Sequence, residues 1–228
     1  MAAPSFSPGL FSFLEELAEH NERPWFKANR QRYDDSVQEP ALAFITEFAP
    51  HLRRITPHSA AVARPVGGSL FRIQRDTRFA RDKTPYKTNV GISFRHEQAA
   101  DVHAPGYYLH LEPGESFAAC GVWHPSTTEL ARIRDAIAAD PDGWAAAAHR
   151  GSFAASFKLD GDSLVRPPRG YDPEHPMIAD LKRKDFIGVA MLTEQAVLAA
   201  GFVEEYARLC EDAVPLMRFL CEAVEVPF

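Results

Sequence analysis

The chain opens with apolar residues at helical spacing. Leu10, Leu14 and Leu17 recur every three or four positions, which places them on one face of a helix. Ser7 and Pro8 stand just before them, and this pair is a start signal because proline is favoured in the first turn of a helix. We therefore predict a first helix that begins beside Pro8.

Two further helices are predicted before the first strand. Trp25, Phe26 and Tyr33 belong to the second helix. Pro40 is expected to start the third helix, and Pro57 follows its end, where proline is common. The apolar stripe of this third helix consists of Ala43, Phe44, Phe48 and Leu52.

The apolar period then changes from helical to alternating. In SLFRIQ, Phe71 and Ile73 face one side and polar residues face the other, which is typical of a β-strand. YKTNVGISFR continues the alternation from Tyr86 to Arg95. The connection between these segments, DTRFARDKTP, is longer than a hairpin turn requires, and connections of this kind often carry function.

Later elements carry clear boundary signals. GYYLHLEPGESFAACGVW is typical of a β-hairpin with Pro113 and Gly114 at its turn. Ser126 and Glu129 form a capping box at the start of the helix that follows. KDFIGVAMLT is predicted to be the last strand, and the C-terminal amphipathic helix is interrupted at Pro215.

The order of these elements predicts an α+β fold. Residues 158–177 are rich in Gly, Pro and Asp, and we expect mostly loop there, with a short strand near Leu164. The N-terminal helices are followed by a mainly antiparallel sheet, with further helices packed on it. No long linker divides the sequence, so we predict a single domain over residues 1–228.

The composition is that of a globular protein. No apolar run approaches the ~20 residues that span a bilayer, so we expect no membrane partner. The N-terminus has neither a basic segment nor a long apolar segment, which predicts no signal peptide. Cys120, Cys210 and Cys221 are too few and too scattered for a disulfide framework or a zinc site. A cytoplasmic location is the simplest expectation.

Charge is distributed unevenly along the chain. The net charge is −6, yet residues 64–95 hold eight Arg and Lys against two Asp, a local charge of +6. The remainder of the chain therefore carries −12. This acidic background repels the phosphates of nucleic acids, so we expect no nucleic-acid partner and favour one small anionic ligand.

The basic stretch has two interpretations, and the sequence leaves both open. Guanidinium and ammonium groups held close together form a site for phosphate or carboxylate. Alternatively, they form a structural network with carboxylates of the chain, and Arg75 would then pair with Asp76 or Asp82. The candidate anion-binding residues are Arg72, Arg75, Arg78, Lys83, Lys87, Asn89 and Arg95.

Candidate proton-transfer groups are predicted near this stretch. His110 is the first candidate, because imidazole exchanges protons near neutral pH and Glu112 shares its strand face. Asp76 is the second candidate, and it would also orient the arginines. The other polar residues expected on the face of His110 are Lys87, Asn89 and Arg95.

Metal and cofactor sites are not predicted. His110, Glu112 and His124 are ligand types for zinc, but the sequence has no close-spaced motif such as H-E-x-x-H. Asp82 and Lys83 are adjacent and point to opposite faces of a strand, which does not fit a metal-dependent nuclease. The sequence also lacks the glycine-rich motifs of P-loop and Rossmann proteins and the nucleophile elbow of α/β-hydrolases.

The basic stretch also carries a family signature. It contains an Arg, then Arg-Asp, Arg-Phe, a Lys and Pro-Tyr-Lys, and the likeness extends to FLEELAEHNERPWF, the hairpin segment and LKRKDF. Over nearly its whole length the chain resembles the domain of unknown function 2461 family of conserved hypothetical bacterial proteins. The resemblance implies no set of catalytic residues. The signature residues are Arg72, Arg75, Asp76, Arg78, Phe79, Lys83, Pro85, Tyr86 and Lys87.

Two functions follow from these observations. The first is binding of a small anion, phosphate or carboxylate, on the stretch Arg72–Lys87, with catalysis left open. The second is a non-catalytic interaction or scaffold protein in which the same Arg, Asp and Lys residues form a structural network. The sequence identifies no protein partner and no cofactor.

Overall fold

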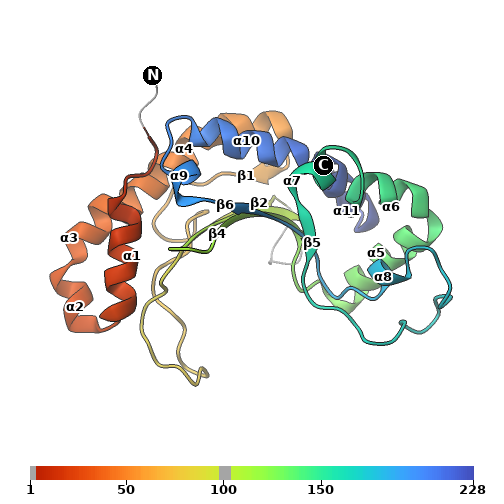
Figure 1. Cartoon of the computed structure of the whole chain (residues 1–228), viewed down its shortest axis with the longest axis horizontal. Helices are drawn as coiled ribbons and strands as arrows, with labels where there is room; N and C mark the ends of the chain where they lie inside the picture. Colours follow the sequence, from red (N-terminus) through yellow and green to blue (C-terminus); the bar gives the residue numbers. More distant parts are fainter. Residues whose placement is uncertain (1–3, 98–103) are drawn as a thin grey trace.

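The computed structural model describes residues 4–97 and 104–228 and has the predicted α+β architecture (Figure 1). The helical elements before the sheet are α1 (Gly9–Glu19), α2 (Arg23–Ala28), α3 (Arg30–Tyr33), the π-helical turn η1 (Asp34–Gln38) and α4 (Glu39–Ile55). The strands are β1 (Ser59–Ala60), β2 (Val90–His96), β3 (Gly106–Leu111), β4 (Ser116–Val122), β5 (Lys158–Asp160) and β6 (Phe186–Leu192). The later helices are α5 (Thr127–Ala139), α6 (Pro141–Ala148), α7 (Gly151–Ser156), α8 (Ile178–Leu181), α9 (Glu194–Val197), α10 (Phe202–Asp212) and α11 (Val214–Ala223).

One antiparallel sheet forms the centre of the molecule. Its strand order is β1-β2-β3-β4-β6-β5, and every pair of neighbours is antiparallel. The hairpin β3–β4 turns at Gly114, whose φ of 74° lies in the left-handed region that glycine adopts without steric penalty. The predicted hairpin and the predicted last strand, β6, are both confirmed.

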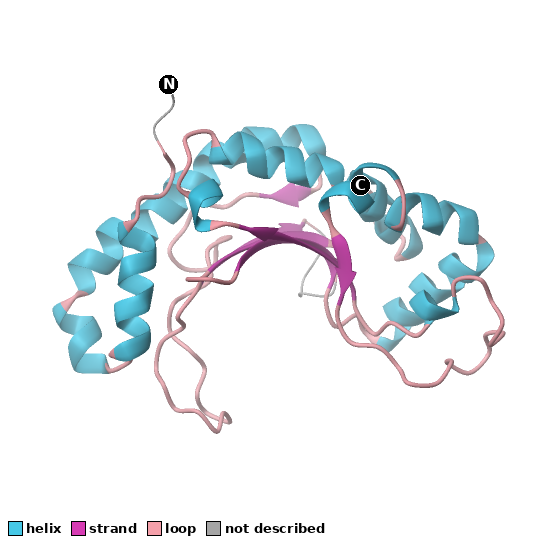
Figure 2. Cartoon of the chain, viewed as in Figure 1, coloured by secondary structure: helices cyan, strands magenta, loops and turns pink. Residues whose placement is uncertain are grey.

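Helices cover one face of the sheet (Figure 2). Phe94 of β2 packs on Phe48 of α4, with ring centroids 4.8 Å apart, and Phe48 in turn lies 4.9 Å from the ring of Tyr206 of α10. All three side chains are buried. Burial of a side chain of this size stabilises the fold by ~1.5–3 kcal/mol, so this layer holds the helices to the sheet.

The opposite face of the sheet is only partly covered. Tyr108 and His110 of β3 and Phe117 of β4 lie there and are half-buried, whereas the residues between them are buried under the helices. The two-residue period of a strand separates the two sets. This second face therefore carries the polar side chains that can meet a ligand.

Several helix boundaries follow their sequence signals. Ser126 accepts a hydrogen bond from the amide of Glu129, and the Glu129 carboxylate accepts one in return, which confirms the capping box of α5. α1 begins directly after Pro8, as predicted. α10 and α11 divide at Ala213, and Pro215 lies in the first turn of α11.

α4 begins at Glu39 with Pro40 in its first turn, as predicted, but the chain is already helical before this point. α3, η1 and α4 follow one another without a gap, so the chain is helical from Arg30 to Ile55. A π-turn shifts the backbone hydrogen bonds by one residue. Pro40 lies just after this turn, separated from it by Glu39. Proline has no N–H to donate, and the regular series of helical backbone hydrogen bonds is already interrupted there.

The predicted strand SLFRIQ is wrong as a regular strand. Isolated bridges join Leu70 to Ile92 and Gln74 to Tyr86. Continuous pairing of β2 begins at Val90, later than the predicted start. Leu70 pairs with the edge of β2 that β1 also occupies, so β1 and Leu70 form one interrupted edge strand, whereas Gln74 pairs outside β2.

The interruption changes which side chains face the core. Leu70 and Ile73 are buried, whereas Phe71 is half-buried and its ring lies 5.9 Å from that of Tyr108 on the open face. Phe71 and Ile73 were predicted to share a side, and they do not. The bend at Ile73 breaks the two-residue period, since a bent strand no longer alternates.

The short strand expected near Leu164 lies earlier, at Lys158–Asp160. Leu164 follows a single bridge, and its amide donates to the carbonyl of Lys182. Within the described residues, no helix is both long and apolar enough to span a membrane. Their buried apolar side chains form one cluster, from Phe6 to Val224, and the single domain stays a prediction.

Candidate functional site

The basic stretch forms an irregular two-stranded arm, residues 69–89. Backbone hydrogen bonds hold it together: the amide of Lys87 donates to the carbonyl of Ile73 at 2.8 Å, and that of Arg75 donates to Pro85 at 2.9 Å. Figure 1 shows this arm, in yellow, projecting from the sheet on the side away from α10. The sequence predicted two strands joined by an irregular connection. The structure instead has one arm whose two sides are joined by these backbone hydrogen bonds.

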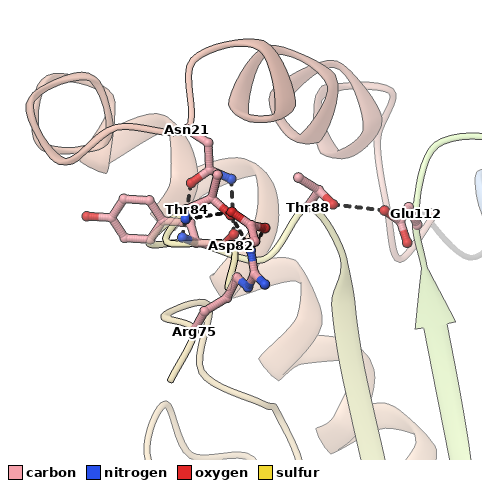
Figure 3. A network of polar contacts seen from close by, with 7 residues as sticks. Asn21, Arg75, Asp82, Thr84, Thr88 and Glu112 are labelled. Carbon is pink, nitrogen blue, oxygen red and sulfur yellow. Dashed lines mark hydrogen bonds and ion pairs between the residues drawn. The ribbon is translucent and has the colours of Figure 1, made fainter. Parts of the chain in front are cut away.

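The base of the arm is fixed to the N-terminal helices. The side-chain amide of Asn21, between α1 and α2, donates to the Tyr86 carbonyl and accepts from the Tyr86 amide, both at 3.0 Å (Figure 3). The Tyr86 ring stacks on Phe26 of α2 with centroids 4.1 Å apart. These contacts set the direction of the chain just before Lys87.

At the tip of the arm, two of the arginines pair with carboxylates of the arm itself. Arg75 bonds to Asp82 and to the hydroxyl of Thr84 (Figure 3), and Arg78 bonds to Asp76 at 2.7 Å. The Arg75 guanidinium, with help from Thr84, lowers the pKa of the Asp82 carboxyl to about 2. The hydrogen bond from Arg78 likewise lowers the pKa of Asp76. At the arm tip, Arg75 and Arg78 therefore form ion pairs within the chain, as the structural interpretation of the basic stretch predicts.

Two other predicted ligands are also committed to contacts within the chain. The ammonium group of Lys83 donates to the carbonyl of Thr77 at 2.9 Å. The side-chain amide of Asn89 lies 3.4 Å from Nδ1 of His110. Both contacts lie within the chain, and neither Lys83 nor Asn89 lines the cavity that three of the other candidates line.

Arg72, Lys87 and Arg95 behave differently, because they line one cavity of about 420 Å³. Lys87 and Arg95 also share an aromatic neighbour: Lys87 Nζ lies 5.2 Å and Arg95 Cζ lies 5.6 Å from the centre of the Phe71 ring. We call this cavity, bounded by these four residues, Ser93 and the loop 60–70, the cationic pocket.

The charges of the cationic pocket are not balanced from within. Among residues 4–97 and 104–228, no carboxylate forms an ion pair with Arg72, Lys87 or Arg95. Partial burial lowers the pKa of the Lys87 ammonium, and the positive charge of Arg72 lowers it further. Contact with the Phe71 ring offsets only part of this repulsion, since an exposed cation–π contact contributes ~0.5–1 kcal/mol.

A chain of hydrogen-bonding side chains runs beside the pocket on the open face of the sheet. Thr88 donates to Glu112 at 2.8 Å (Figure 3), and the other Glu112 oxygen lies 2.9 Å from His110 Nε2. His110 Nδ1 lies 3.1 Å from the hydroxyl of Tyr108. His110 stacks on Phe117 at 4.6 Å, which fixes the imidazole plane.

This polar chain has a defined direction. A carboxylate only accepts, so Nε2 of His110 carries the hydrogen toward Glu112, and Nδ1 of the neutral ring accepts from Tyr108. Burial raises the pKa of Tyr108 to about 12, and the charge of Glu112 acts in the same direction. The hydrogen bonds therefore connect the Tyr108 hydroxyl to His110 and on to Glu112, and the phenol stays protonated at neutral pH.

The two predicted catalytic candidates are thus separated. His110 belongs to the polar chain, next to Tyr108, whose ring contacts Phe71 of the cationic pocket. Asp76 lies on the arm and bonds to Arg78, and no described hydrogen bond or ion pair joins it to His110. Asp76 does orient an arginine, as the sequence indicated, but outside the pocket.

The remaining candidate chemistry is that of metal ligands and of cysteine thiols. Within the described ranges, no group of three His, Cys, Asp or Glu side chains is arranged to hold a metal ion. His124, considered with His110, bonds to Asp185 instead. Burial raises the pKa of the Cys120 thiol to about 12, so it is not a thiolate nucleophile at neutral pH.

Three contributors to the site escaped the sequence prediction. They are Phe71, the loop 60–70 and Asn21, none of which is among the site residues predicted from the sequence. Each acts through a contact with a residue distant in sequence, such as Asn21 with Tyr86. A polar residue directly between two helices is a signal for such a long-range hydrogen bond, although the sequence does not identify the partner residue.

Comparison with known proteins places the chain by its sequence. No curated protein matches it. The family model described as "Conserved hypothetical protein (DUF2461)" matches residues 9–219, which is most of the chain and includes the arm and the polar chain. The protein is therefore a member of the DUF2461 family.

Proposed function

We propose that this protein binds a small anion, phosphate or carboxylate, in the cationic pocket. One observation carries the proposal: Arg72, Lys87 and Arg95 line the same cavity without an ion-pairing carboxylate among the described residues. Arg75 and Arg78 of the same stretch do have such partners. The anion-binding and structural interpretations thus apply to different parts of the stretch.

The physical argument is one of charge balance. Three like charges that line one cavity repel, and the charge of Arg72 adds to the effect of burial in lowering the pKa of Lys87. An anion between them reverses the sign of the interaction, and hydrogen bonds from guanidinium to oxyanion are about twice as strong as neutral ones. Arginine adds a planar fork that matches phosphate and carboxylate oxygens.

Catalysis is the second part of the proposal, and the polar chain supports it. A bound anion beside Phe71 would lie next to Tyr108, whose hydroxyl bonds to His110. His110, oriented by Glu112, would accept or return a proton through that hydroxyl. Proton transfer by positioned groups of this kind contributes ~10²–10⁴-fold to a reaction rate.

A non-catalytic interaction protein is the alternative, and the tip of the arm favours it. Phe79 is 95% exposed on the projecting arm, where its ring could pack on another molecule. In that case the tip, and not the pocket, would be the functional element.

Thermal denaturation with inorganic phosphate distinguishes these proposals. A ligand of the native state at one hundred times its Kd stabilises the fold by ~2.7 kcal/mol, so the melting temperature should rise with phosphate concentration. Lys87→Met and Arg95→Gln should abolish the rise, while Arg78→Gln, a control at the arm tip, should keep it. Acetate replaces phosphate in a parallel series to separate the two head groups.

The result that contradicts anion binding is equally clear. Neither phosphate nor acetate would shift the melting temperature of the wild type beyond the effect of chloride at equal ionic strength. A shift that Arg78→Gln removes and Lys87→Met keeps would instead assign the anion to the arm tip.

A further inference from the structure

One wall of the cationic pocket is apolar. Val62, Pro65, Val66 and Leu70 line the same cavity as the charged residues. The Val66 side chain is apolar, yet it is 82% exposed to solvent. Exposed apolar surface inside a cavity that also holds charges is a feature of ligand sites, because small-molecule pockets combine apolar walls with a few polar groups.

This wall is built by a loop that is closed on itself. The amide of Ser69 donates to the Val62 carbonyl at 2.8 Å, and the amide of Val62 donates to the Ser69 hydroxyl at 3.0 Å. Gly68 packs so closely that a methyl group there would lie 2.4 Å from the Val62 carbonyl oxygen. The loop therefore holds Val66 in place before any ligand arrives, which lowers the entropy cost of binding.

The size of the pocket also exceeds the needs of an inorganic ion. A phosphate displaces roughly five waters, on the order of 150 Å³ at ~30 Å³ each. The cavity measures about 420 Å³, within the ~300–1,000 Å³ typical of small-molecule sites. An anion held by Arg72, Lys87 and Arg95 would leave the apolar wall in contact with water alone.

We propose that the pocket takes an organic phosphate monoester whose apolar body, about the size of one ring, lies against Val62, Pro65 and Val66. The inference rests on the proposed anion site and specifies its ligand. A monoester carries a charge of about −2 near neutral pH, so it balances three cations better than a carboxylate does. Val66 is then the specificity-determining residue, since it is the most exposed part of the wall.

Titration calorimetry with phenyl phosphate, inorganic phosphate and benzoate tests this assignment on the full chain. Phenyl phosphate should bind about tenfold more tightly than inorganic phosphate, because burying roughly 55 Å² of apolar surface at ~25 cal/mol per Å² corresponds to that factor. Val66→Ser should reduce the ratio to about threefold. Val165→Ser is the matched control, because Val165 is 94% exposed and lies outside the pocket.

The outcomes separate this inference from the proposed function. Equal affinities for phenyl phosphate and inorganic phosphate, or a ratio that Val66→Ser does not change, would overturn the apolar subsite and leave the anion site standing. Benzoate binding as tightly as phenyl phosphate would overturn the assignment of the ligand as a phosphate monoester. No binding of any of the three compounds would overturn the anion site and the inference together.

Discussion

Lys87 is the residue at which binding and stability oppose each other. Its ammonium group is half-buried, near Arg72 and over the Phe71 ring, and burial followed by the charge of Arg72 lowers its pKa below 10.5. A charge kept under such conditions reduces the free energy of unfolding. Groups that destabilise the native state in this way concentrate at functional sites.

Replacing Lys87 should therefore not destabilise the protein at neutral pH. The Met of Lys87→Met keeps the apolar stem and removes the charge, so we expect a free energy of unfolding equal to or above that of the wild type at pH 7. Between the lowered native pKa and 10.5, the unfolded wild type binds more protons, so its stability rises with pH. Urea unfolding at pH 7 to 10 should show the advantage of the variant shrinking, and an advantage independent of pH would contradict this account.

Asp82 shows the opposite sign at the arm tip. Its pKa of about 2, caused first by Arg75, lies below the ordinary value of 3.8, so its contribution to stability is present above pH 3.8 and is lost as the pH falls toward 2. Carboxyl carbon NMR should follow this titration directly. In Arg75→Ala the Asp82 pKa should rise toward 3.8, while that of Asp76, which pairs with Arg78, should stay in place. An unchanged Asp82 pKa in this variant would show that Arg75 is not the cause of the low pKa of Asp82.

At the scale of elements, the arm depends on its anchor in the helical N-terminal part. Asn21 satisfies both backbone groups of Tyr86, and Tyr86 directly precedes Lys87. Asn21→Ala leaves two partly buried backbone groups without partners, so we expect a loss of ~1–3 kcal/mol in the free energy of unfolding. Hydrogen exchange at the Tyr86 amide should accelerate in the same variant.

Asn29→Ala is the matched control for the anchor. Its side-chain amide donates to the carbonyl of Trp25 and accepts from Arg32, and neither residue contacts the Tyr86 backbone, so its loss should leave exchange at the Tyr86 amide unchanged. Equal protection of that amide in Asn21→Ala and the wild type would show that the arm is held by other contacts, such as the stacking of Tyr86 on Phe26.

The predictability of each element follows from where its signals lie. The β3–β4 hairpin and the α5 capping box were predictable, since Gly114, Ser126 and Glu129 act on neighbours in sequence. The interrupted edge strand was not, because the register between Leu70 and Ile92 is set across the intervening loop and arm. The π-turn before Pro40 escaped for a similar reason: no local pattern distinguishes it from an α-helical turn.

The candidate site divides in the same way. The sequence selected seven residues by charge and polarity, and three of them line the cationic pocket: Arg72, Lys87 and Arg95. What separates these three from Arg75 and Arg78 is the presence of a partner carboxylate, which depends on the fold of the arm tip. The local sequence identifies the charged residues, but it does not show which of them form ion pairs.

At the scale of the whole molecule, one buried cluster connects the N-terminal helices to the C-terminal helices. Phe6, Phe44 and Phe202 illustrate this, with the rings of Phe6 and Phe44 5.4 Å apart and those of Phe44 and Phe202 5.6 Å apart. A core shared in this way predicts that both parts unfold in one cooperative transition, as expected for a single domain.

Fluorine NMR of protein labelled with 5-fluorotryptophan tests this prediction in one sample. Trp25 of α2 reports on the N-terminal helices, and buried Trp144 of α6 reports on the later ones. Both native signals should disappear at the same urea concentration. Loss of the Trp25 signal before that of Trp144 would mean that the helical N-terminal part unfolds separately.

A crystal structure of the protein with phosphate is the most direct test of the cationic pocket. The account predicts one phosphate within hydrogen-bonding distance of Arg72, Lys87 and Arg95, beside the Phe71 ring. A pocket that holds no phosphate at a concentration that saturates the protein in solution, or a phosphate bound only to Arg78 at the arm tip, would contradict it.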